Sequence, residues 1–372
     1  MLPLCAHHHA VDSPARKRAL TLGAAAAAAL LIIVAVCSCG KAPSDATEQS
    51  QMRAISRAVF AGGRLWLLQD DGSLASLAPE GAKAQSVTTA GRVLDICKSS
   101  GTVAVLIEGK GRWSLQVRSP SGWNAVATVP TEGDSFVALD CEDGGGPVTA
   151  VTNRRLVELR GGGSRSTQLR QPLEPPFGMA TALGTPEAVW LGFNVGEWGG
   201  GLRRISRSDG TVEMVERNRS GQPCGGPLNS ACDPVAGIIA APWDPRCAIA
   251  AIGLVHMMAH GRIVEICGSK VRRLYFKPFD PQPRNGGLDD GEPASTVAFF
   301  GLARNGNTWW ALGMDGLYRF DGTHVSEFRP LPAFEDKGGY SVSFAIPGLA
   351  LVRTGINQRR SLSGSVPIMA VR

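Results

Sequence analysis

The sequence has little net charge for its length. Arg16, Lys17 and Arg18 against Asp12 give residues 1–38 a net charge of +2, which leaves +4 of the chain's +6 for more than 300 residues. A nucleic-acid-binding protein concentrates Lys and Arg on one face, so this dilute charge predicts no nucleic-acid partner. Beyond the N-terminal segment, the sequence also lacks an apolar run long enough to span a bilayer.

The sequence lacks the common catalytic motifs as well. It contains no G-x-S-x-G, no G-x-x-x-x-G-K-[ST], no G-x-G-x-x-G and no calcium-loop pattern, so a nucleophile elbow and the usual phosphate cradles have no support. Two pairs of adjacent carboxylates, Asp70-Asp71 and Asp289-Asp290, each precede a glycine and are typical of solvated turns. The sequence therefore assigns no catalytic residue and favours a protein that is not an enzyme.

Metal-ligating patterns are equally scarce. His256 and His260 have the spacing of two ligands on one helical face, but the Glu of a metalloprotease motif is missing. Because the segment lies between two apolar strands, His260-Gly261 is predicted to form a hairpin turn. No C-x₂-C pair occurs, which argues against zinc. The sequence predicts neither a metal ion nor a cofactor.

The N-terminus has the three parts of an export signal. The basic residues Arg16–Arg18 precede 18 uncharged residues from Ala19 to Val36, and Val36-Cys37-Ser38-Cys39-Gly40 follows. These last residues resemble a bacterial lipobox, which implies that Cys39 carries a diacylglyceryl group and becomes the new N-terminus. Residues 1–38 are then a lipoprotein signal peptide and residues 39–53 a polar tether. An uncleaved anchor helix and ordinary signal cleavage are the alternatives.

All three alternatives predict that the bulk of the chain lies outside the cytoplasm. In enteric-type lipoproteins an Asp after the lipidated cysteine marks retention in the inner membrane, and Gly40 stands at that position here. The resemblance therefore favours a lipid-anchored protein on the periplasmic face or the surface of the outer membrane.

Turn-forming residues are abundant after the leader. The chain has 46 glycines and 24 prolines in 372 residues, and past residue 53 no apolar pattern with a 3.6-residue period is sustained. Many short strands joined by tight turns fit this composition better than helices do. We predict an all-β fold over residues 54–372.

One module of four short strands recurs along the chain. Its clearest copy runs from Thr296 to Phe328, with Asn305-Gly306, Asp315-Gly316 and Asp321-Gly322 as hairpin turns. This copy resembles the repeat of sensor-type β-propellers of the two-component-regulator kind, which implies a blade of a β-propeller. The resemblance covers about 30 residues in detail and implies nothing about a ligand.

Alignment on the second strand of the module gives seven copies, which predicts seven four-stranded blades. Six or eight blades are alternatives, because the fifth copy is stretched by two insertions. The C-terminal run Val366–Arg372 is predicted to close the ring by pairing with the strand at residues 54–60. The second strands are predicted to begin at Arg64, Thr102, Pro147, Ala188, Cys247, Thr308 and Gly348.

Six cysteines follow Cys39, and an even number in an exported chain indicates disulfides. One predicted pair joins equivalent strand ends in adjacent blades, one staples a loop, and one links the ends of neighbouring strands in a hairpin. In that order the pairs are Cys97–Cys141, Cys224–Cys232 and Cys247–Cys267.

The longest irregular segments, at residues 217–234, 277–293 and 329–339, are predicted blade crossings. In propellers these crossings and the middle-hairpin turns open on one face, and loops on a rigid scaffold often carry function. We therefore predict a binding face rimmed by Trp198, Trp243, His260 and Asp315.

The function that these features favour is an envelope-anchored, non-enzymatic scaffold that binds a protein or a peptide, through loops or strand edges. Lipid-anchored propellers that serve outer-membrane assembly are similar in architecture. Two alternatives stay open: a glycan- or peptide-active enzyme with carboxylates at the propeller channel, and a small-ligand sensor domain.

Overall fold

The computed structural model describes residues 55–81, 83–141, 146–216, 226–256, 258–278, 295–331, 340–354 and 368–372. The predicted signal peptide, Cys39 and the tether lie outside these ranges. The chain divides into two units, Met1–Gln49 and Ser50–Arg372, and all of the described residues belong to the second. None of the helices in the described ranges has the length and apolar character needed to cross a bilayer.

The described residues form 27 strands and one short 3₁₀ helix, grouped in seven sheets. Blades 1 to 3 contain β1 (Ile55–Ala61), β2 (Arg64–Gln69), β3 (Leu74–Leu77) and β4 (Gln85–Val87); β5 (Arg92–Ser99), β6 (Thr102–Gly109), β7 (Arg112–Ser119) and β8 (Gly122–Pro130); and β9 (Phe136–Cys141), β10 (Val148–Thr152), β11 (Arg155–Arg160) and β12 (Gly163–Gln168). Blades 4 and 5 contain β13 (Met179–Gly184), β14 (Ala188–Asn194), η1 (Gly196–Trp198), β15 (Gly200–Ser206) and β16 (Val212–Val215); and β17 (Val235–Ala241), β18 (Asp244–His256), β19 (Met258–Cys267) and β20 (Lys270–Tyr275). Blades 6 and 7 contain β21 (Phe299–Asn305), β22 (Thr308–Gly313), β23 (Gly316–Asp321) and β24 (His324–Pro330); and β25 (Tyr340–Ser343), β26 (Leu349–Thr354) and β27 (Ile368–Val371).

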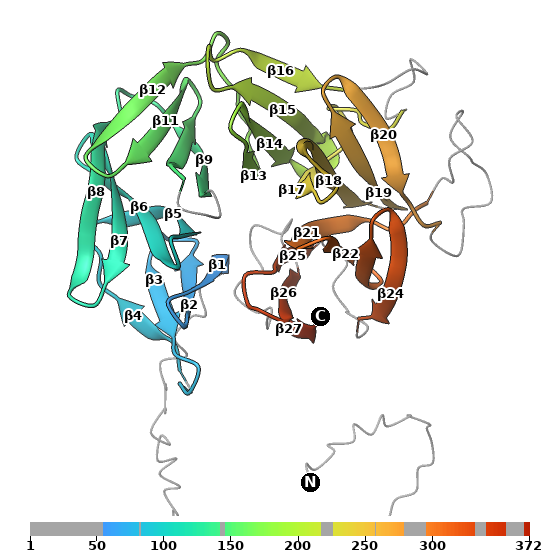
Figure 1. Ribbon diagram of the computed structural model, residues 1–372, viewed down its shortest axis with the longest axis horizontal. Coiled ribbons are helices and arrows are strands. Elements are labelled where there is room, and N and C mark those ends of the chain that lie inside the picture. The colour runs from blue at the N-terminus through green and yellow to red at the C-terminus, as the bar shows by residue number, and fades with distance from the viewer. Residues whose placement is uncertain are drawn as a thin grey trace, which may run out of the picture. The chain divides into compact units, whose positions relative to one another are not determined.

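The seven sheets stand in a ring in chain order (Figure 1), so the chain is a seven-bladed β-propeller. Each sheet is antiparallel, with its strands in sequence order from first to last. Six sheets have four strands, and the seventh has three within the described residues. The predicted fold and blade number are confirmed, and the seven predicted second strands correspond to β2, β6, β10, β14, β18, β22 and β26.

The predicted closure of the ring by the C-terminal strand is wrong. β27 pairs with β26 of its own blade, in a register that puts Val371 opposite Leu349, whereas β1 pairs with β2. The C-terminal strand thus finds its antiparallel partner within the seventh blade, and among the described residues the first and last blades share no strand. They meet instead through the innermost strands, where Ser343 Oγ donates a hydrogen bond to the carbonyl oxygen of Ala58 at 2.9 Å.

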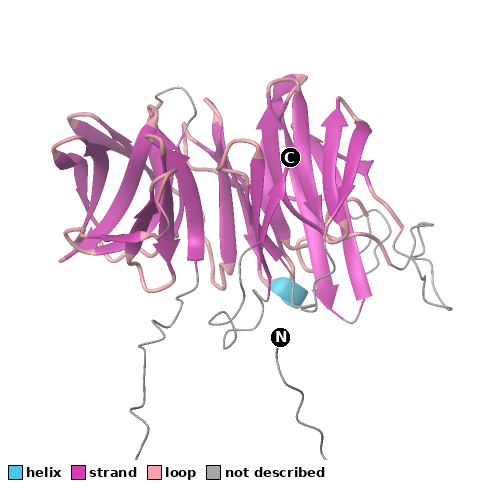
Figure 2. Cartoon of the chain, turned by 90° about the horizontal axis from the view of Figure 1, so that it is seen from below, coloured by secondary structure: helices cyan, strands magenta, loops and turns pink. Residues whose placement is uncertain are grey.

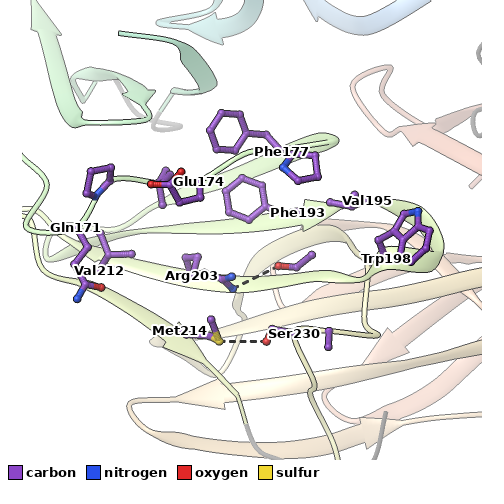
Figure 3. Close-up of a pocket in the computed structure, with 15 residues that line it drawn as sticks. Gln171, Glu174, Phe177, Phe193, Val195, Trp198, Arg203, Val212, Met214 and Ser230 are labelled. Atoms are coloured by element: carbon purple, nitrogen blue, oxygen red, sulfur yellow. Dashed lines mark hydrogen bonds between the residues drawn. The ribbon is translucent and has the colours of Figure 1, made fainter. Parts of the chain in front are cut away.

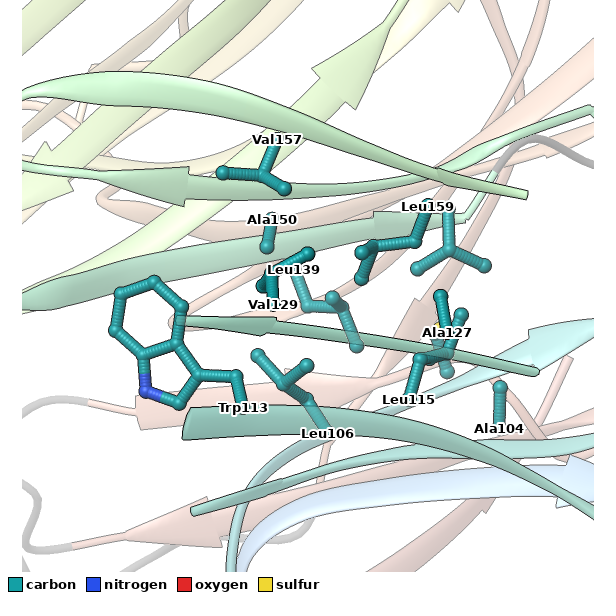
Figure 4. Close-up of a cluster of buried hydrophobic side chains, with 12 residues drawn as sticks. Ala104, Leu106, Trp113, Leu115, Ala127, Val129, Leu139, Ala150, Val157 and Leu159 are labelled. Atoms are coloured by element: carbon teal, nitrogen blue, oxygen red, sulfur yellow. The ribbon is translucent and has the colours of Figure 1, made fainter. Parts of the chain in front are cut away.

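The hydrophobic core lies between the blades, because one four-stranded sheet is too small to bury its own face. Figure 4 shows the contact between blades 2 and 3, where Trp113 and Leu106 face Leu139 and Val157, all of them buried. Alternation along each strand supplies these side chains to both faces of a blade. Burial of each such side chain contributes roughly 1.5–3 kcal/mol, so neighbouring blades stabilise one another around the ring.

Two of the three predicted cysteine pairs are disulfide-bonded. Cys97 and Cys141, whose Cα atoms are 6.0 Å apart, join β5 to β9 and therefore link adjacent blades. Cys247 and Cys267, whose Cα atoms are 4.4 Å apart, lie directly opposite each other on β18 and β19. Cys232 is disulfide-bonded, and its predicted partner Cys224 lies outside the described residues.

Candidate functional site

The strand order of a blade gives the propeller two different faces. The turn between the second and third strands and the crossing to the next blade lie at one end of the strands, and the other two hairpin turns lie at the opposite end. We call the first end the crossing face; it carries η1, seen at the lower edge in Figure 2, and the turn at Asp315. Three of the four predicted binding residues, Trp198, His260 and Asp315, belong to this end of their blades.

Trp243 does not belong to the predicted face. It lies in the turn between β17 and β18, the first hairpin of blade 5, so it is at the opposite end of the strands. Its indole Nε1 donates a hydrogen bond to Glu265 Oε1 at 2.6 Å. Trp243 is therefore not part of the binding face that the sequence predicted.

The middle hairpin of blade 4 presents Trp198 at its tip because three glycines allow the chain to turn beneath it. Gly199 and Gly201 have φ values of 71° and 68°, which favour glycine. A Cβ on Gly199 would lie 2.5 Å from the backbone of Ala231, and one on Gly201 would lie 2.7 Å from Ser230. The glycines thus seat the crossing to blade 5 against the hairpin, and Trp198 is left 74% exposed.

Beside this hairpin lies a cavity of about 520 Å³ on the side of blade 4 that faces blade 3 (Figure 3). Its walls come from the crossing between blades 3 and 4, from β14–β16 with the hairpin turn at Trp198, and from the last part of the crossing to blade 5. Two aromatic rings, Phe177 and Phe193, pack with centroids 6.0 Å apart. We call this cavity the blade-4 pocket; it is lined by Gln171, Pro172, Leu173, Glu174, Pro176, Phe177, Phe193, Val195, Trp198, Gly200, Arg203, Val212, Met214, Ser230 and Ala231.

The cationic side chain of the pocket is Arg203 on β15. Its Nη1 donates to the carbonyl oxygens of Leu202 at 3.2 Å and Gly200 at 3.4 Å. Burial lowers the pKa of the Arg203 guanidinium, and the nearby charge of Glu216 raises it by a smaller amount. Within the described residues no carboxylate lies within ion-pair distance of Arg203, so a half-buried positive charge faces the pocket.

Glu216, the carboxylate whose charge acts on Arg203, forms its hydrogen bonds with Ser230 instead. Glu216 Oε2 accepts hydrogen bonds from the hydroxyl of Ser230 and from its backbone N–H, the latter at 3.3 Å. Ser230 Oγ also lies 3.2 Å from Met214 Sδ (Figure 3). The crossing to blade 5 therefore holds Glu216 and Met214 at the edge of the pocket.

His260 is part of a buried ionic cluster on the crossing face. Arg262 donates through Nη2 to Asp233 Oδ2 and through Nη1 to His260 Nε2, both at 2.6 Å. The hairpin turn predicted at His260-Gly261 is wrong, because both positions are inside β19, with His260 opposite Leu254 and Gly261 opposite Gly253. A Cβ on Gly261 would lie 2.5 Å from Ala298 Cα, so this glycine serves close packing against the next blade.

Asp315 has a comparable role in blade 6. Its carboxylate accepts hydrogen bonds from Lys277 Nζ at 2.6 Å and from the hydroxyl of Tyr318 at 2.7 Å. Burial and the hydrogen bond to Asp315 raise the pKa of Tyr318. Because Lys277 is on the crossing from blade 5, the cluster fixes that crossing to the turn.

Carboxylates on the innermost strands could have signalled an enzyme at the channel. Asp95 on β5 forms an ion pair with Arg57 at 2.9 Å, and Asp140 on β9 lies 4.0 Å from Arg207. Both carboxylates are buried and face an arginine of another blade, an arrangement that ties blades together. Among the described residues, no group of three His, Cys, Asp or Glu side chains is placed to hold a metal ion.

The sequence analysis missed Arg203, although a signal was present. In Gly-Leu-Arg-Arg-Ile, from Gly201 to Ile205, alternation puts Arg203 on the side of the buried Ile205 and Arg204 on the side of the buried Leu202, so both arginines share a strand face with an apolar residue. An arginine on the apolar side of a strand requires either a counter-ion or a ligand. That pattern is visible without a structure, but the absence of a carboxylate partner is not.

Comparison with known proteins concerns the fold alone. No protein-family model and no curated protein matches the chain. Solved structures similar to it include the extracellular domain of a putative one-component system from B. thetaiotaomicron, with 13% identity and a TM-score of 0.44. That match covers 82% of this chain and 37% of the other. YCF48 bound to D1 peptide has 12% identity, a TM-score of 0.49 and coverage of 81% of this chain and 88% of that one. BamB from Moraxella catarrhalis has 11% identity, a TM-score of 0.42 and coverage of 84% and 95%.

Proposed function

We propose that the chain is an exported, membrane-anchored β-propeller that binds a segment of another protein in the blade-4 pocket. The observation that carries this proposal is the position of Trp198, which is 74% exposed at the rim of a cavity of about 520 Å³. Tryptophan is among the residues most enriched at binding hot spots, and ligand pockets typically have volumes of about 300–1,000 Å³. An exposed indole beside an apolar cavity is therefore suited to bind an apolar side chain of a partner protein.

The rigidity of the surroundings supports the same proposal. Phe193, Arg203 and Met214 line the pocket from strands, and the close approach of Gly199 and Gly201 to the crossing to blade 5 seats the hairpin that carries Trp198. A preformed site loses less conformational entropy on binding than a mobile loop does. Loops and turns on such a scaffold are the usual location of binding residues.

Export is supported by the cysteines. Disulfides persist in oxidising compartments, and the described residues include one disulfide between blades, one within a blade and a further disulfide-bonded cysteine, Cys232. The anchor is proposed from the lipobox-like residues Val36–Cys39. With lipidation at Cys39, a tether of residues 39–53 would keep the propeller close to the membrane, where an anchored binding protein meets partners of the same envelope.

Site-specific photocrosslinking tests this function. A benzophenone amino acid replaces Gln171, an exposed residue of the pocket lining, in the full-length chain expressed in a bacterial envelope, and a matched variant carries it at Trp243 on the opposite end of the strands. We expect a discrete protein adduct from position 171 that is lost when Phe177→Asp is added, because that change places a charge in the apolar wall of the pocket. An equal yield of the same adduct from positions 171 and 243, or no adduct from position 171, would contradict the proposed function.

A further inference from the structure

Resting on the proposed function, we infer that the blade-4 pocket selects a peptide segment with a carboxylate next to a large apolar side chain. Arg203 would bind the carboxylate, and the aromatic walls would take the apolar side chain. The carboxylate could belong to an Asp or Glu side chain or to the C-terminus of the partner, and both have the same chemistry toward a guanidinium.

The hydrogen bonds of Arg203 leave one edge of its guanidinium for a ligand. Nη1 is bound to the carbonyl oxygens of Gly200 and Leu202 on the same strand. Nε and Nη2 have no hydrogen-bond partner within the described residues. These two nitrogens form the side of the guanidinium that matches the two oxygens of a carboxylate, with two parallel N–H···O bonds.

The energetics of the site also favour an anion. Burial lowers the pKa of Arg203, which means that the pocket destabilises its charge, and Glu216 offsets only part of this effect. Because Glu216 is held by Ser230, it is not placed to neutralise Arg203 by direct contact. A carboxylate brought by a ligand would supply the missing charge-assisted hydrogen bonds, which are about twice as strong as neutral ones.

The walls of the pocket require more than a carboxylate from the ligand. Phe177 and Phe193 form a packed aromatic surface, Trp198 stands at the rim, and Met214 is 56% exposed. Phe193 is already buried, whereas a small carboxylate bound to Arg203 would leave Trp198, Met214 and the half-buried ring of Phe177 in contact with water. A neighbouring aromatic or large aliphatic side chain would cover them, and burial of apolar surface contributes roughly 25 cal/mol per Å².

Glu174 is the acidic residue of the pocket lining and, together with the charge of Glu216, opposes this assignment. It lies in the lining of the pocket on the crossing between blades 3 and 4 and is exposed to solvent. Solvent and salt screen an exposed charge, so its repulsion of an incoming carboxylate is small. Glu174→Gln should then strengthen the binding of an acidic peptide slightly at low salt, in the direction opposite to the effect of Arg203→Gln.

Peptide arrays with the full-length chain in detergent test the selected class. One array holds random octapeptides attached through their C-terminus, which blocks the α-carboxylate, and a second holds them attached through their N-terminus. We expect the wild type to enrich an acidic residue beside an aromatic or aliphatic one on the first array if the side-chain carboxylate is used. If the α-carboxylate is used, enrichment of apolar C-terminal residues appears on the second array only.

Variants of Arg203 then test whether this residue recognises the carboxylate of the peptide. Arg203→Gln should weaken binding of the best synthetic peptide about 10-fold or more and remove the preference for a carboxylate, while the apolar preference persists. Arg203→Lys keeps the positive charge but cannot donate two parallel hydrogen bonds to one carboxylate. This variant should retain the preference for a carboxylate but bind the peptide more weakly. If the wild type enriches apolar peptides without a carboxylate, or if Arg203→Gln retains the preference, the inference fails and the proposed function stands. If the wild type enriches no peptide on either array, both fail.

Discussion

Ser343 on β25 and Ala58 on β1 join the last blade to the first, with the Ser343 hydroxyl donating to the Ala58 carbonyl at 2.9 Å across 285 residues of sequence. Within each blade, hydrogen bonds join strands that are consecutive in the chain. The bond between Ser343 and Ala58 instead joins the first and the last blade. In the part of the chain that the structure describes, the first and last sheets share no strand, so their contact there depends on side chains and on this hydrogen bond. The junction between blades 7 and 1 is therefore where single substitutions should affect closure of the ring.

Ser343→Ala tests the contribution of that hydrogen bond together with the one that Ser343 Oγ accepts from the backbone N–H of Ala345 at 3.3 Å. A net hydrogen bond is worth about 1 kcal/mol, and loss of the donor leaves the carbonyl of Ala58 with one partner fewer. We expect the free energy of unfolding in urea to fall by about 1 kcal/mol. Ser208→Ala is the matched control, since the hydroxyl of Ser208 is exposed and bonds only to Ser206 within one turn. Equal stability of both variants would refute a role for Ser343 in closure.

The buried pair of Arg262 and Asp233 should be far more important for stability than an exposed pair. Their side chains are 1% and 0% exposed, and Arg262 also donates to the carbonyl oxygens of Pro227 and Gly226. Arg262→Met removes the ion-pair partner of a buried carboxylate, which keeps the backbone N–H of Asn229 and the nearby His260, and loss of such a partner typically costs about 3–5 kcal/mol. Thermal unfolding should show a large fall in Tm for Arg262→Met and none for Arg246→Ala, which breaks the exposed pair with Asp244. Similar Tm values for the two variants would disprove the assignment.

Asp95 should make the stability of the propeller depend on pH. Burial raises the pKa of its carboxyl above the usual value of 3.8, although Arg57 and two backbone N–H groups partly lower it. A carboxyl with a raised folded-state pKa stabilises the fold below its unfolded pKa, and this contribution is lost as the pH rises through the folded-state pKa.

The measurement is urea unfolding of the wild type and of Asp95→Asn at a series of pH values from about 3 to 7. The amide that Asp95→Asn introduces does not titrate, so subtraction removes the contribution of all other groups. We expect the stability of the wild type relative to Asp95→Asn to fall as the pH rises above about 4. A difference that rises with pH over that range would have the wrong sign for a raised pKa.

The sequence was sufficient for the blades because their second strands are apolar runs bounded by glycine turns. Thr308–Gly313 between Asn305-Gly306 and Asp315-Gly316 is an example, and β22 has those bounds. The same reasoning failed at His260-Gly261, where the glycine allows close packing on Ala298 and the strand continues. A glycine in a turn and a glycine under a neighbouring blade look alike in sequence, and only long-range packing distinguishes them.

The candidate site was predictable only in part. The Gly-rich hairpin pointed to Trp198 as an exposed aromatic residue on a turn, and the structure places it there. The importance of Arg203 depends on where Glu216 and Ser230 lie after folding, since their hydrogen bonds keep the carboxylate of Glu216 from Arg203. Such pairing between the third and fourth strands and a crossing segment has no periodic signature in the sequence.

Cys39→Ala tests the proposed anchor. Two signals are usually needed for stable membrane attachment by lipid chains, and a diacylglyceryl-modified cysteine supplies two acyl chains. The wild type should sediment with membranes and show the mass of a lipidated N-terminal cysteine, whereas Cys39→Ala should not be cleaved after Ser38. Cys37→Ala is the control, because the neighbouring cysteine is removed with the leader. Normal cleavage of Cys39→Ala would show that the export signal is of the ordinary kind.

The central claim is that the blade-4 pocket is the binding site, and one titration tests it most directly. The peptide that binds best on the arrays is titrated calorimetrically into the wild type, Trp198→Ala and Trp243→Ala. Truncation of a hot-spot tryptophan typically costs about 2 kcal/mol or more, so Trp198→Ala should raise the Kd about 30-fold, while Trp243→Ala leaves it unchanged. Unchanged affinity in Trp198→Ala, or an equal loss in both variants, would contradict the assignment of the pocket.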